Sequence, residues 1–117
     1  MQAAVSSSRC FIAFTPQDIL PLLDGRIRAV LRRQFSGKVG DTFYAGESGL
    51  LCRVTRIEHL PISRAAVIHH SRLGFTSPQD VLADWQRHHP HIGHRHDLPT
   101  FYVEFEPVYQ GGDPCQK

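Results

Sequence analysis

The segment from Arg26 to Arg33 alternates between apolar and basic side chains, and this pattern constrains the fold more than any other in the chain. Positions 27, 29 and 31 are apolar, whereas three of the four even positions from 26 to 32 are arginine. Alternation with a period of two predicts a β-strand. A face with three guanidinium groups must meet water, carboxylates or an anion, because buried charges need partners. We therefore expect this strand to border solvent or a binding site.

The remaining patterns predict four further strands and three helices. The four residues after Phe14 and the four after Thr76 share an N-cap, a proline in the first turn and an acid, which together favour a helix start. The expected strands are 10–14, 26–33, 42–44, 50–60 and 100–108, and the expected helices start near Thr15, Pro61 and Ser77 and end near Gly25, Gly74 and Pro90. This order predicts an α+β domain with a small mixed sheet or barrel, because strands and helices do not alternate.

The chain of 117 residues is long enough for one domain with a buried core. We expect flexible ends at 1–9 and 110–117 around a folded unit at 10–109. The formal net charge is only +2, but eleven of the thirteen basic residues are arginine, whose planar fork suits phosphate groups and base edges. An anionic partner is one explanation of this bias, and a general preference for arginine in the genome is another.

Three cysteines, at positions 10, 52 and 115, are too few and too widely spaced for a disulfide framework or a zinc knuckle. Cys10 and Cys52 lie in apolar surroundings and are expected to be buried. No apolar run is long enough to span a membrane, and the first residues lack the apolar core of a signal peptide. We therefore expect a reduced, cytoplasmic protein without a membrane partner.

Four segments resemble the ASCH domain family, which belongs to the PUA-like superfamily. Residues 25–32, followed by Val-Gly-Asp at 39–41, are similar to the family's Gly-x-Lys-x-x-x-x-Arg strand and the turn after it. Residues 73–80 resemble the family's Gly-Phe-x-Ser junction between two helices, and residues 101–105 resemble its closing strand. The four segments follow the family's order and spacing, and this agreement makes the resemblance specific.

The resemblance implies a PUA-like β-barrel with helices packed at its ends and a cleft that binds RNA. Some small bacterial members are amidohydrolases of acylated cytidine, and others are ribonucleases. In the hydrolases a lysine and a threonine of the motif strand carry the chemistry; the matching positions here are Ile27 and Val30, while Gly25 and Arg32 are kept. Neither isoleucine nor valine can transfer a proton or act as a nucleophile. The resemblance therefore implies binding of RNA or a nucleotide, without hydrolysis through those two positions.

Basic and aromatic side chains are the candidate RNA contacts. Phosphates would relieve the repulsion between guanidinium groups on one strand, and aromatic rings near a basic cleft would stack on bases. The predicted nucleic-acid-binding residues are Arg26, Arg28, Arg32, Arg33, Lys38, Tyr44 and Tyr102. Phe75 and Tyr109 are further candidates for stacking, whereas the helical spacing of Trp85 from Val81 predicts a core residue. The alternative for the arginines is a solvated face that pairs with Asp24, Asp41, Glu104 and Glu106.

Five histidines between residues 88 and 96 form a second notable group. Those at positions 91, 94 and 96 are close enough in sequence for one loop to gather them around a metal, but no cysteine or second segment supplies further ligands. We therefore expect a solvated loop and neither a metal nor another cofactor. In the adjacent pair His69 and His70, at most one side chain can face the core.

An enzymatic role is the alternative to simple binding. A hydrolase or ribonuclease with an altered site would use Arg32 as a phosphate or oxyanion clamp, Tyr102 or Glu104 as a proton carrier, and a loop histidine as the base. No nucleophile elbow surrounds a serine, and residues 46–49 lack the lysine of a phosphate-binding loop. An interaction scaffold that uses the acidic second half of the chain as its surface is a third hypothesis.

Overall fold

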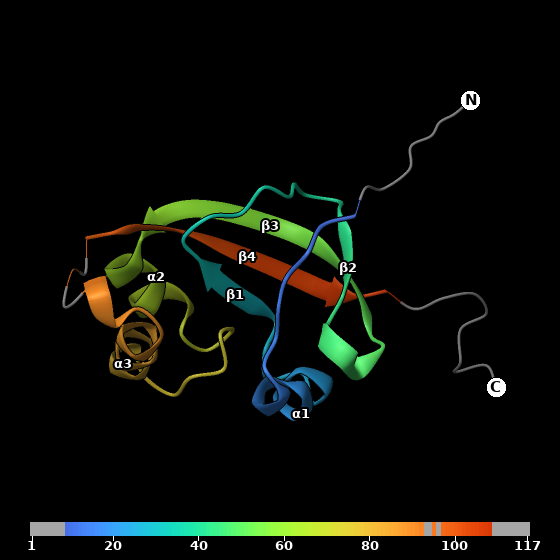
Figure 1. The fold of residues 1–117 in the computed structure, drawn as a ribbon, viewed down its shortest axis with the longest axis horizontal. Coiled ribbons are helices and arrows are strands. Elements are labelled where there is room, and N and C mark those ends of the chain that lie inside the picture. Colours follow the sequence, from blue (N-terminus) through green and yellow to red (C-terminus); the bar gives the residue numbers. More distant parts are fainter. Residues whose placement is uncertain (1–8, 93–94, 96, 109–117) are drawn as a thin grey trace.

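The computed structural model describes residues 9–92, 95 and 97–108, which form an α+β domain around one curled sheet (Figure 1). Its four strands are β1 (Ala29–Arg32), β2 (Thr42–Tyr44), β3 (Leu51–Pro61) and β4 (Pro99–Pro107). They lie in the order β1-β4-β3-β2, and all three pairs of neighbours are antiparallel. The sheet curves into a half-barrel, which confirms the α+β class and the barrel-like architecture.

Three helices pack against this sheet: α1 (Ile19–Leu23), α2 (Ile62–His69) and α3 (Pro78–His88). The pair α2 and α3 lies together at one end of the domain, and α1 lies at the other, directly after a 3-10 turn at Pro16–Asp18 (Figure 1). None of the helices in the described ranges is long and apolar enough to cross a membrane.

Both repeated helix starts form as predicted. A carboxylate oxygen of Asp18 accepts hydrogen bonds from the backbone N–H and the hydroxyl of Thr15, at 3.2 and 3.0 Å. The hydroxyl of Ser77 accepts from the backbone N–H of Asp80 at 3.2 Å and caps α3. These contacts satisfy donors that the first turn of a helix leaves without a partner.

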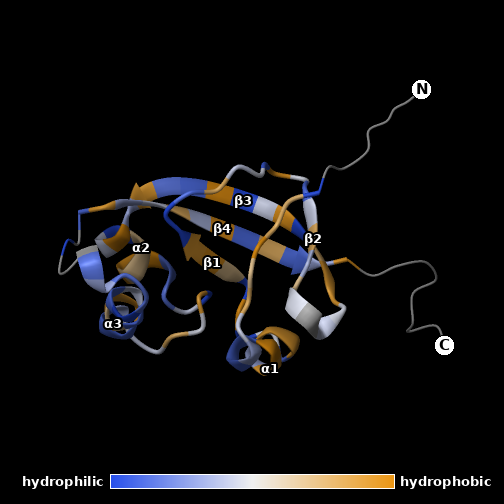
Figure 2. Cartoon of the chain, viewed as in Figure 1, coloured by the Kyte–Doolittle hydropathy of each residue, from blue (hydrophilic) through white to orange (hydrophobic). Residues whose placement is uncertain are grey.

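Both faces of the sheet are covered, so the domain has two apolar clusters. Along β4, Val103 and Phe105 pack on one face and Tyr102 on the other, as their alternation predicts, and Figure 2 shows the mixed hydropathy of this strand. The first cluster, which includes the N-terminal segment and α1, holds Ile12, Leu22, Val30, Phe43, Ala45, Cys52, Val54, Val103 and Phe105. The second, which includes α2 and α3, holds Ala29, Ile62, Ala66, Leu73, Val81, Trp85 and Tyr102. Neighbouring residues of β1 therefore pack into opposite cores.

The predicted strand at 10–14 does not form. Arg9 makes one isolated parallel bridge to Thr42, and the residues after it cross the first cluster without pairing along an edge. Ile12 is buried, whereas Phe11 is 83% exposed. The continuous apolar run in this segment is therefore only partly buried, and it does not form a strand.

Two other elements, a strand and a helix, are shorter than predicted. The strand expected at 26–33 begins only at Ala29, because the backbone N–H groups of Arg26 and Ile27 both donate to the carbonyl of Pro21, at 2.9 and 3.2 Å. The helix expected from Pro61 ends at His69 and continues as turns to Gly74. His69 is buried and His70 is not, in agreement with the expectation for this pair.

The described chain enters and leaves the sheet at the same end, near the first residues of β3. Arg9 bridges to Thr42 on β2, and the backbone N–H of Val108 donates to the carbonyl of Leu51 on β3 at 2.8 Å. Of the flexible ends predicted at 1–9 and 110–117, all residues except Arg9 lie outside the described ranges. Of the cysteines, Cys52 is buried and Cys10 is half-buried.

Candidate nucleic-acid interface

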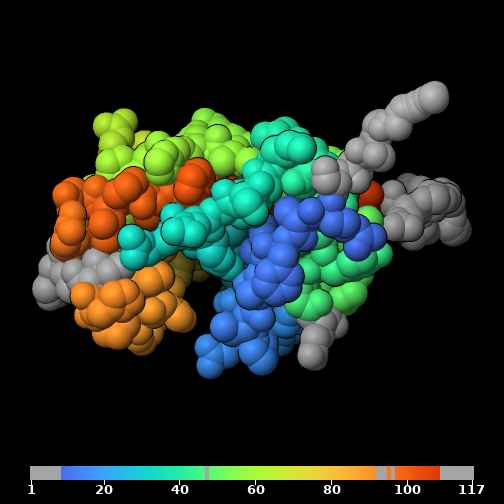
Figure 3. Space-filling view, turned by 45° about the horizontal axis from the view of Figure 1, so that its top comes forward, coloured from blue at the N-terminus to red at the C-terminus, as the bar shows by residue number. Residues whose placement is uncertain are grey.

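A cleft of about 640 Å³ opens between the N-terminal segment and α3. Figure 3 shows it as a gap between the orange helix and the blue segment. One wall is formed by residues 13–15, 17, 18 and 21, and the other by Val81, Asp84, Trp85, His88 and His89. Residues of the β1 region and of the turn at 73–75 form the floor. The cleft therefore lies at the β1 edge of the sheet, with an apolar floor and polar rims.

Ile27 and Val30, which replace the lysine and threonine of the resembled motif, both lie in this cleft. Ile27 is half-buried and Val30 is buried in the first core. Leu73 and Phe75 extend the apolar floor toward α3. The positions that carry hydrolysis in the resembled enzymes are thus occupied here by hydrocarbon.

Gly74 closes this floor in a backbone conformation that other residues rarely adopt, with a φ of 93°. A Cβ at Gly74 would lie 2.8 Å from Cγ1 of Ile27. Replacing Gly74 with alanine is therefore expected to lower the free energy of unfolding by about 2 kcal/mol, from backbone strain and overpacking. Gly40→Ala is the matched control, because Gly40 has a φ of 97° and open space around it.

Urea unfolding of the two glycine variants measures the contact with Ile27 separately from the strain. The Gly40 variant should lose about 1 kcal/mol, which is the strain alone. Equal losses in the two variants would contradict a close contact between Gly74 and Ile27.

Arg32 is the cation most firmly held in the cleft. One terminal nitrogen donates to the carbonyl of Leu31 at 2.8 Å, and the other donates to the carbonyl of Ala13 at 2.7 Å. Burial lowers the pKa of Arg32, and the nearby carboxylate of Asp18 opposes that shift. Among the described residues no carboxylate forms an ion pair with Arg32. Because a guanidinium has five N–H groups, Arg32 keeps donors beyond these two bonds.

The other arginines of the predicted face have different surroundings. Arg26 and Arg33 are exposed and line the cleft, and Arg26 forms an ion pair with Asp24 at 2.9 Å. Arg28 does not line it: its guanidinium donates to the carbonyls of Leu22 and Ile27, at 2.9 and 3.1 Å. Arg28 therefore fastens the carboxyl end of α1 to the strand.

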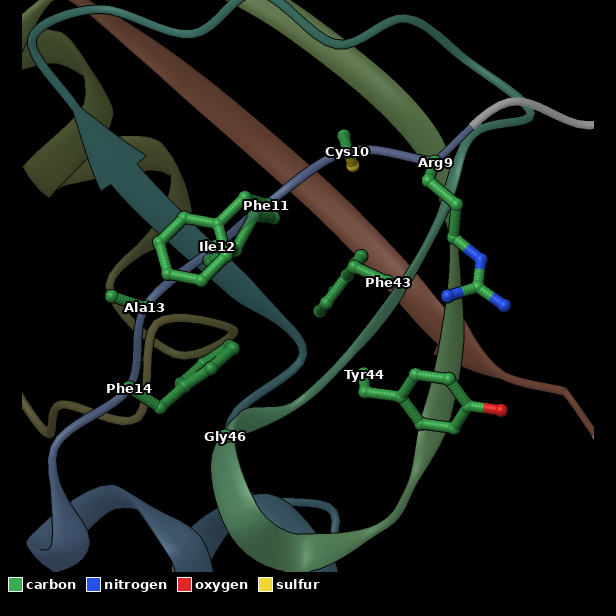
Figure 4. Close-up of a pocket in the computed structure, with 9 residues that line it drawn as sticks. All are labelled: Arg9, Cys10, Phe11, Ile12, Ala13, Phe14, Phe43, Tyr44 and Gly46. Atoms are coloured by element: carbon green, nitrogen blue, oxygen red, sulfur yellow. The ribbon is translucent and has the colours of Figure 1, made fainter.

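Lys38 and Tyr44 lie elsewhere on the surface. Lys38 is exposed in the loop before β2, and its backbone N–H donates to the carboxylate of Asp41 at 3.0 Å. Tyr44 lines a second hollow, of about 480 Å³, where the guanidinium of Arg9 stands 5.1 Å from its ring centre (Figure 4). Phe11 and Phe14 contribute to the same hollow. The structure thus separates these two residues from the arginine-lined cleft.

Tyr102 is a core residue. It is fully buried, its ring stacks on His69 with centroids 3.7 Å apart, and its hydroxyl donates to the carboxylate of Glu104 at 2.6 Å. Burial raises the pKa of Tyr102, and the Glu104 carboxylate raises it further. Neither Tyr102 nor Glu104 lines the cleft, which leaves them apart from the arginines. Glu104 instead faces the guanidinium of Arg72, at 3.5 Å.

The wall formed by α3 was not predicted as part of the site. Trp85 is 7% exposed, as expected for a core residue, but it also lines the cleft, and its Nε1 has no hydrogen-bond partner in the described chain. His88 and His89 continue this wall at the end of the helix. The spacing of Val81, Asp84, Trp85 and His88 along one helical face is the sequence signal that could have indicated a shared surface.

The histidine group is only partly described. His94 and His96 lie outside the described residues. Within the described ranges, no three His, Cys, Asp or Glu side chains are grouped so that they could hold a metal ion.

The formal charge of the cleft lining comes from three arginines and from two aspartates, Asp18 and Asp84. It amounts to one positive charge when the histidines are neutral.

Comparisons with known proteins place the fold. No protein-family model matches the chain, and no curated protein matches it. A hypothetical protein designated PH0355 superposes with a TM-score of 0.63 at 15% identity, over 82% of this chain and 95% of that one. A DUF984 protein, EF3133 from Enterococcus faecalis V583, gives 0.60 at 16% identity, over 79% and 67%. An ASCH domain from Lactobacillus crispatus gives 0.57 at 17% identity, over 89% and 80%. The chain therefore has the fold of an ASCH domain.

Proposed function

We propose that this domain binds single-stranded RNA or a nucleotide in the cleft between its N-terminal segment and α3, and that it does so without catalysis. The observation that carries the proposal is Arg32, a half-buried guanidinium held by two backbone carbonyls inside the cleft. A guanidinium fixed in this way is prepared to bind a phosphate, because little side-chain freedom is lost on binding.

The rest of the cleft fits a nucleotide. Arg33 adds an exposed cation beside Arg32, while Phe75 and Trp85 add aromatic surface. Sites for small ligands are commonly apolar hollows of this size with a few polar groups at the rim. The ASCH-like fold supports the same ligand class, since the family is proposed to bind RNA. Free thiols at Cys10 and Cys52 agree with the further proposal of a reducing, cytoplasmic location.

Replacing Arg33 with alanine is expected to weaken binding of a short labelled oligouridylate about tenfold, through loss of one phosphate contact. Binding would be followed by fluorescence anisotropy across a series of salt concentrations. The slope of log affinity against log salt should fall by about 0.7 for the lost contact to a single strand. Arg33 suits this test better than Arg32, because its exposed side chain does not hold the N-terminal segment.

Arg64→Ala is the matched control for this experiment. Arg64 is an exposed arginine of α2 outside the cleft lining, so its loss changes the net charge by the same amount. If the two variants weaken binding equally, the cleft is not the binding site. If the unaltered protein shows no salt-dependent binding to RNA, the proposed function is wrong.

Catalysis remains the competing hypothesis, and the cleft supports it less well. Tyr102 and Glu104, the candidate proton carriers, are absent from the cleft lining, and Ile27 and Val30 occupy the motif positions. Incubation of the pure protein with RNA and with acylated nucleosides, with and without EDTA, tests this directly. Turnover that is abolished by histidine substitutions in α3 would favour an enzyme over a binding module.

A further inference from the structure

We propose that His88 and His89 form a proton-dependent phosphate contact across the cleft from Arg32 and Arg33. RNA affinity then rises as the pH falls through the range in which imidazole gains its proton. The inference rests on the proposed function. It adds two side chains, His88 and His89, whose protonation changes the charge of the cleft.

The hydrogen bonds of the two histidines determine which nitrogen each presents. Nδ1 of His88 lies 2.9 Å from the carbonyl oxygen of Asp84, and Nδ1 of His89 lies 3.1 Å from that of Trp85. A carbonyl oxygen only accepts, so Nδ1 must carry the hydrogen in both rings. The neutral rings therefore keep an unprotonated Nε2 with a lone pair, which becomes an N–H donor only when the ring is protonated.

This change matters because the cleft is only weakly positive without it. Three arginines and two aspartates in the lining leave one formal positive charge, and two imidazolium groups would raise it to three. A neutral Nε2 presents a lone pair to a phosphate oxygen, whereas a protonated Nε2 donates a charge-assisted hydrogen bond to it. Protonation thus changes both the charge and the direction of the hydrogen bond.

The two histidines have charged and aromatic neighbours on α3 and in the turn after it. His88 faces the carboxylate of Asp84 at 3.6 Å, and that carboxylate is also held by Arg87 at 2.7 Å. His89 stacks on Trp85 with ring centres 4.2 Å apart, and the ring of His91 lies 6.4 Å away. The other charged residues that line the cleft are Arg26, Arg32, Arg33 and Asp18.

A short labelled oligouridylate is the probe, because its phosphodiesters keep a constant charge between about pH 5.5 and about pH 8. Fluorescence anisotropy should show affinity rising about tenfold as the pH falls across this range. The double variant His88→Gln with His89→Gln should bind as the unaltered protein does at high pH and should lose the dependence on pH. The single variant His88→Gln, at a largely exposed position, should lose part of it without disturbing the Trp85 stack.

His59→Gln is the matched control, because His59 also stacks on an aromatic ring, that of Phe101 at 4.4 Å, but lies outside the cleft lining. This variant should keep the full dependence on pH. The inference is wrong if the unaltered protein binds equally well at both ends of the range, or if the double variant keeps the dependence while retaining its native circular dichroism. Absence of binding at every pH overturns the proposed function itself, and the inference with it.

Discussion

Replacing Trp85 with alanine is expected to lower the free energy of unfolding by about 3–5 kcal/mol. Trp85 is 7% exposed and packs in the second core with Val81, Leu73 and Tyr102. Its ring also carries the stack with His89. Removing the indole leaves a cavity between α3 and the sheet, which neighbouring side chains cannot fill without moving the helix. For a domain whose total stability is about 5–15 kcal/mol, this loss is a large fraction of the whole.

Trp85→Phe keeps an aromatic ring at this position and removes the indole N–H. It therefore separates the contribution of the ring's volume to stability from the contribution of the N–H group. Because Nε1 has no hydrogen-bond partner in the described chain, phenylalanine removes a buried donor that is already unsatisfied. We therefore expect this variant to lose less than half as much stability as the alanine variant. Urea unfolding followed by far-ultraviolet circular dichroism measures both, since Trp85 is the chain's single tryptophan and its fluorescence is lost. Equal losses would show that the indole N–H contributes a bond.

The second large effect is expected at high pH. Burial raises the pKa of Tyr102, and the carboxylate of Glu104 raises it further. In the unfolded chain a tyrosine ionises near pH 10, so above that value unfolding releases a proton that the native state keeps. Stability from this group is complete below about pH 10 and falls by about 1.4 kcal/mol for each further pH unit. Two pH units then remove about 2.7 kcal/mol.

Tyr102→Phe should remove the part of the alkaline slope that comes from Tyr102, although it also lowers stability at neutral pH by removing the hydrogen bond to Glu104. The slope of unfolding free energy against pH is therefore the quantity to compare. Tyr44→Phe, at a half-exposed tyrosine, is the control and should keep the slope. Burial also raises the pKa of Cys52 to about 11, so part of the loss that begins near pH 9 remains in both variants. An unchanged slope in Tyr102→Phe would contradict this account.

Local chemistry was enough to predict most elements of this fold. The caps at Thr15 and Ser77 and the alternation along β4 act through neighbours in the chain, so the residues themselves carry the information. The strand expected at 10–14 does not form, because an apolar run indicates burial, whereas a strand also needs an edge with which to pair. No property of those five residues shows that they cross a core.

The arginine face was harder to interpret because its partners are backbone atoms. The sequence suggested water, carboxylates or an anion, but Arg28 and Arg32 donate to the carbonyls of Leu22 and Ala13. Every residue has a carbonyl, so no sequence pattern marks the one that a guanidinium will reach. Among the residues that the structure describes, Arg26 is the one arginine of this face that pairs with an acid named beforehand, Asp24.

Only part of the candidate site was predicted from the sequence, and the rest was missed for a similar reason. Arg26, Arg32 and Arg33 line the cleft, while Lys38, Tyr44 and Tyr102 lie elsewhere. The alternation along β4 places Tyr102 in one of the two cores. Only the packing of α2 against the sheet determines which core that is. His88 and His89, at the end of the predicted helix, were interpreted together with the loop histidines and not with the arginines, because the wall opposite them is distant in the sequence.

The entry and exit of the described chain at one end of the sheet have a practical consequence. Arg9 bridges to β2 and Val108 continues β4 beside the start of β3, and neither residue lines the cleft at the β1 edge. The domain is therefore suited to insertion as a cassette into a surface loop of a host protein, because both attachment points lie at the same end of the sheet. Fluorescent proteins or affinity handles joined at these points would not be attached to any residue that lines the cleft.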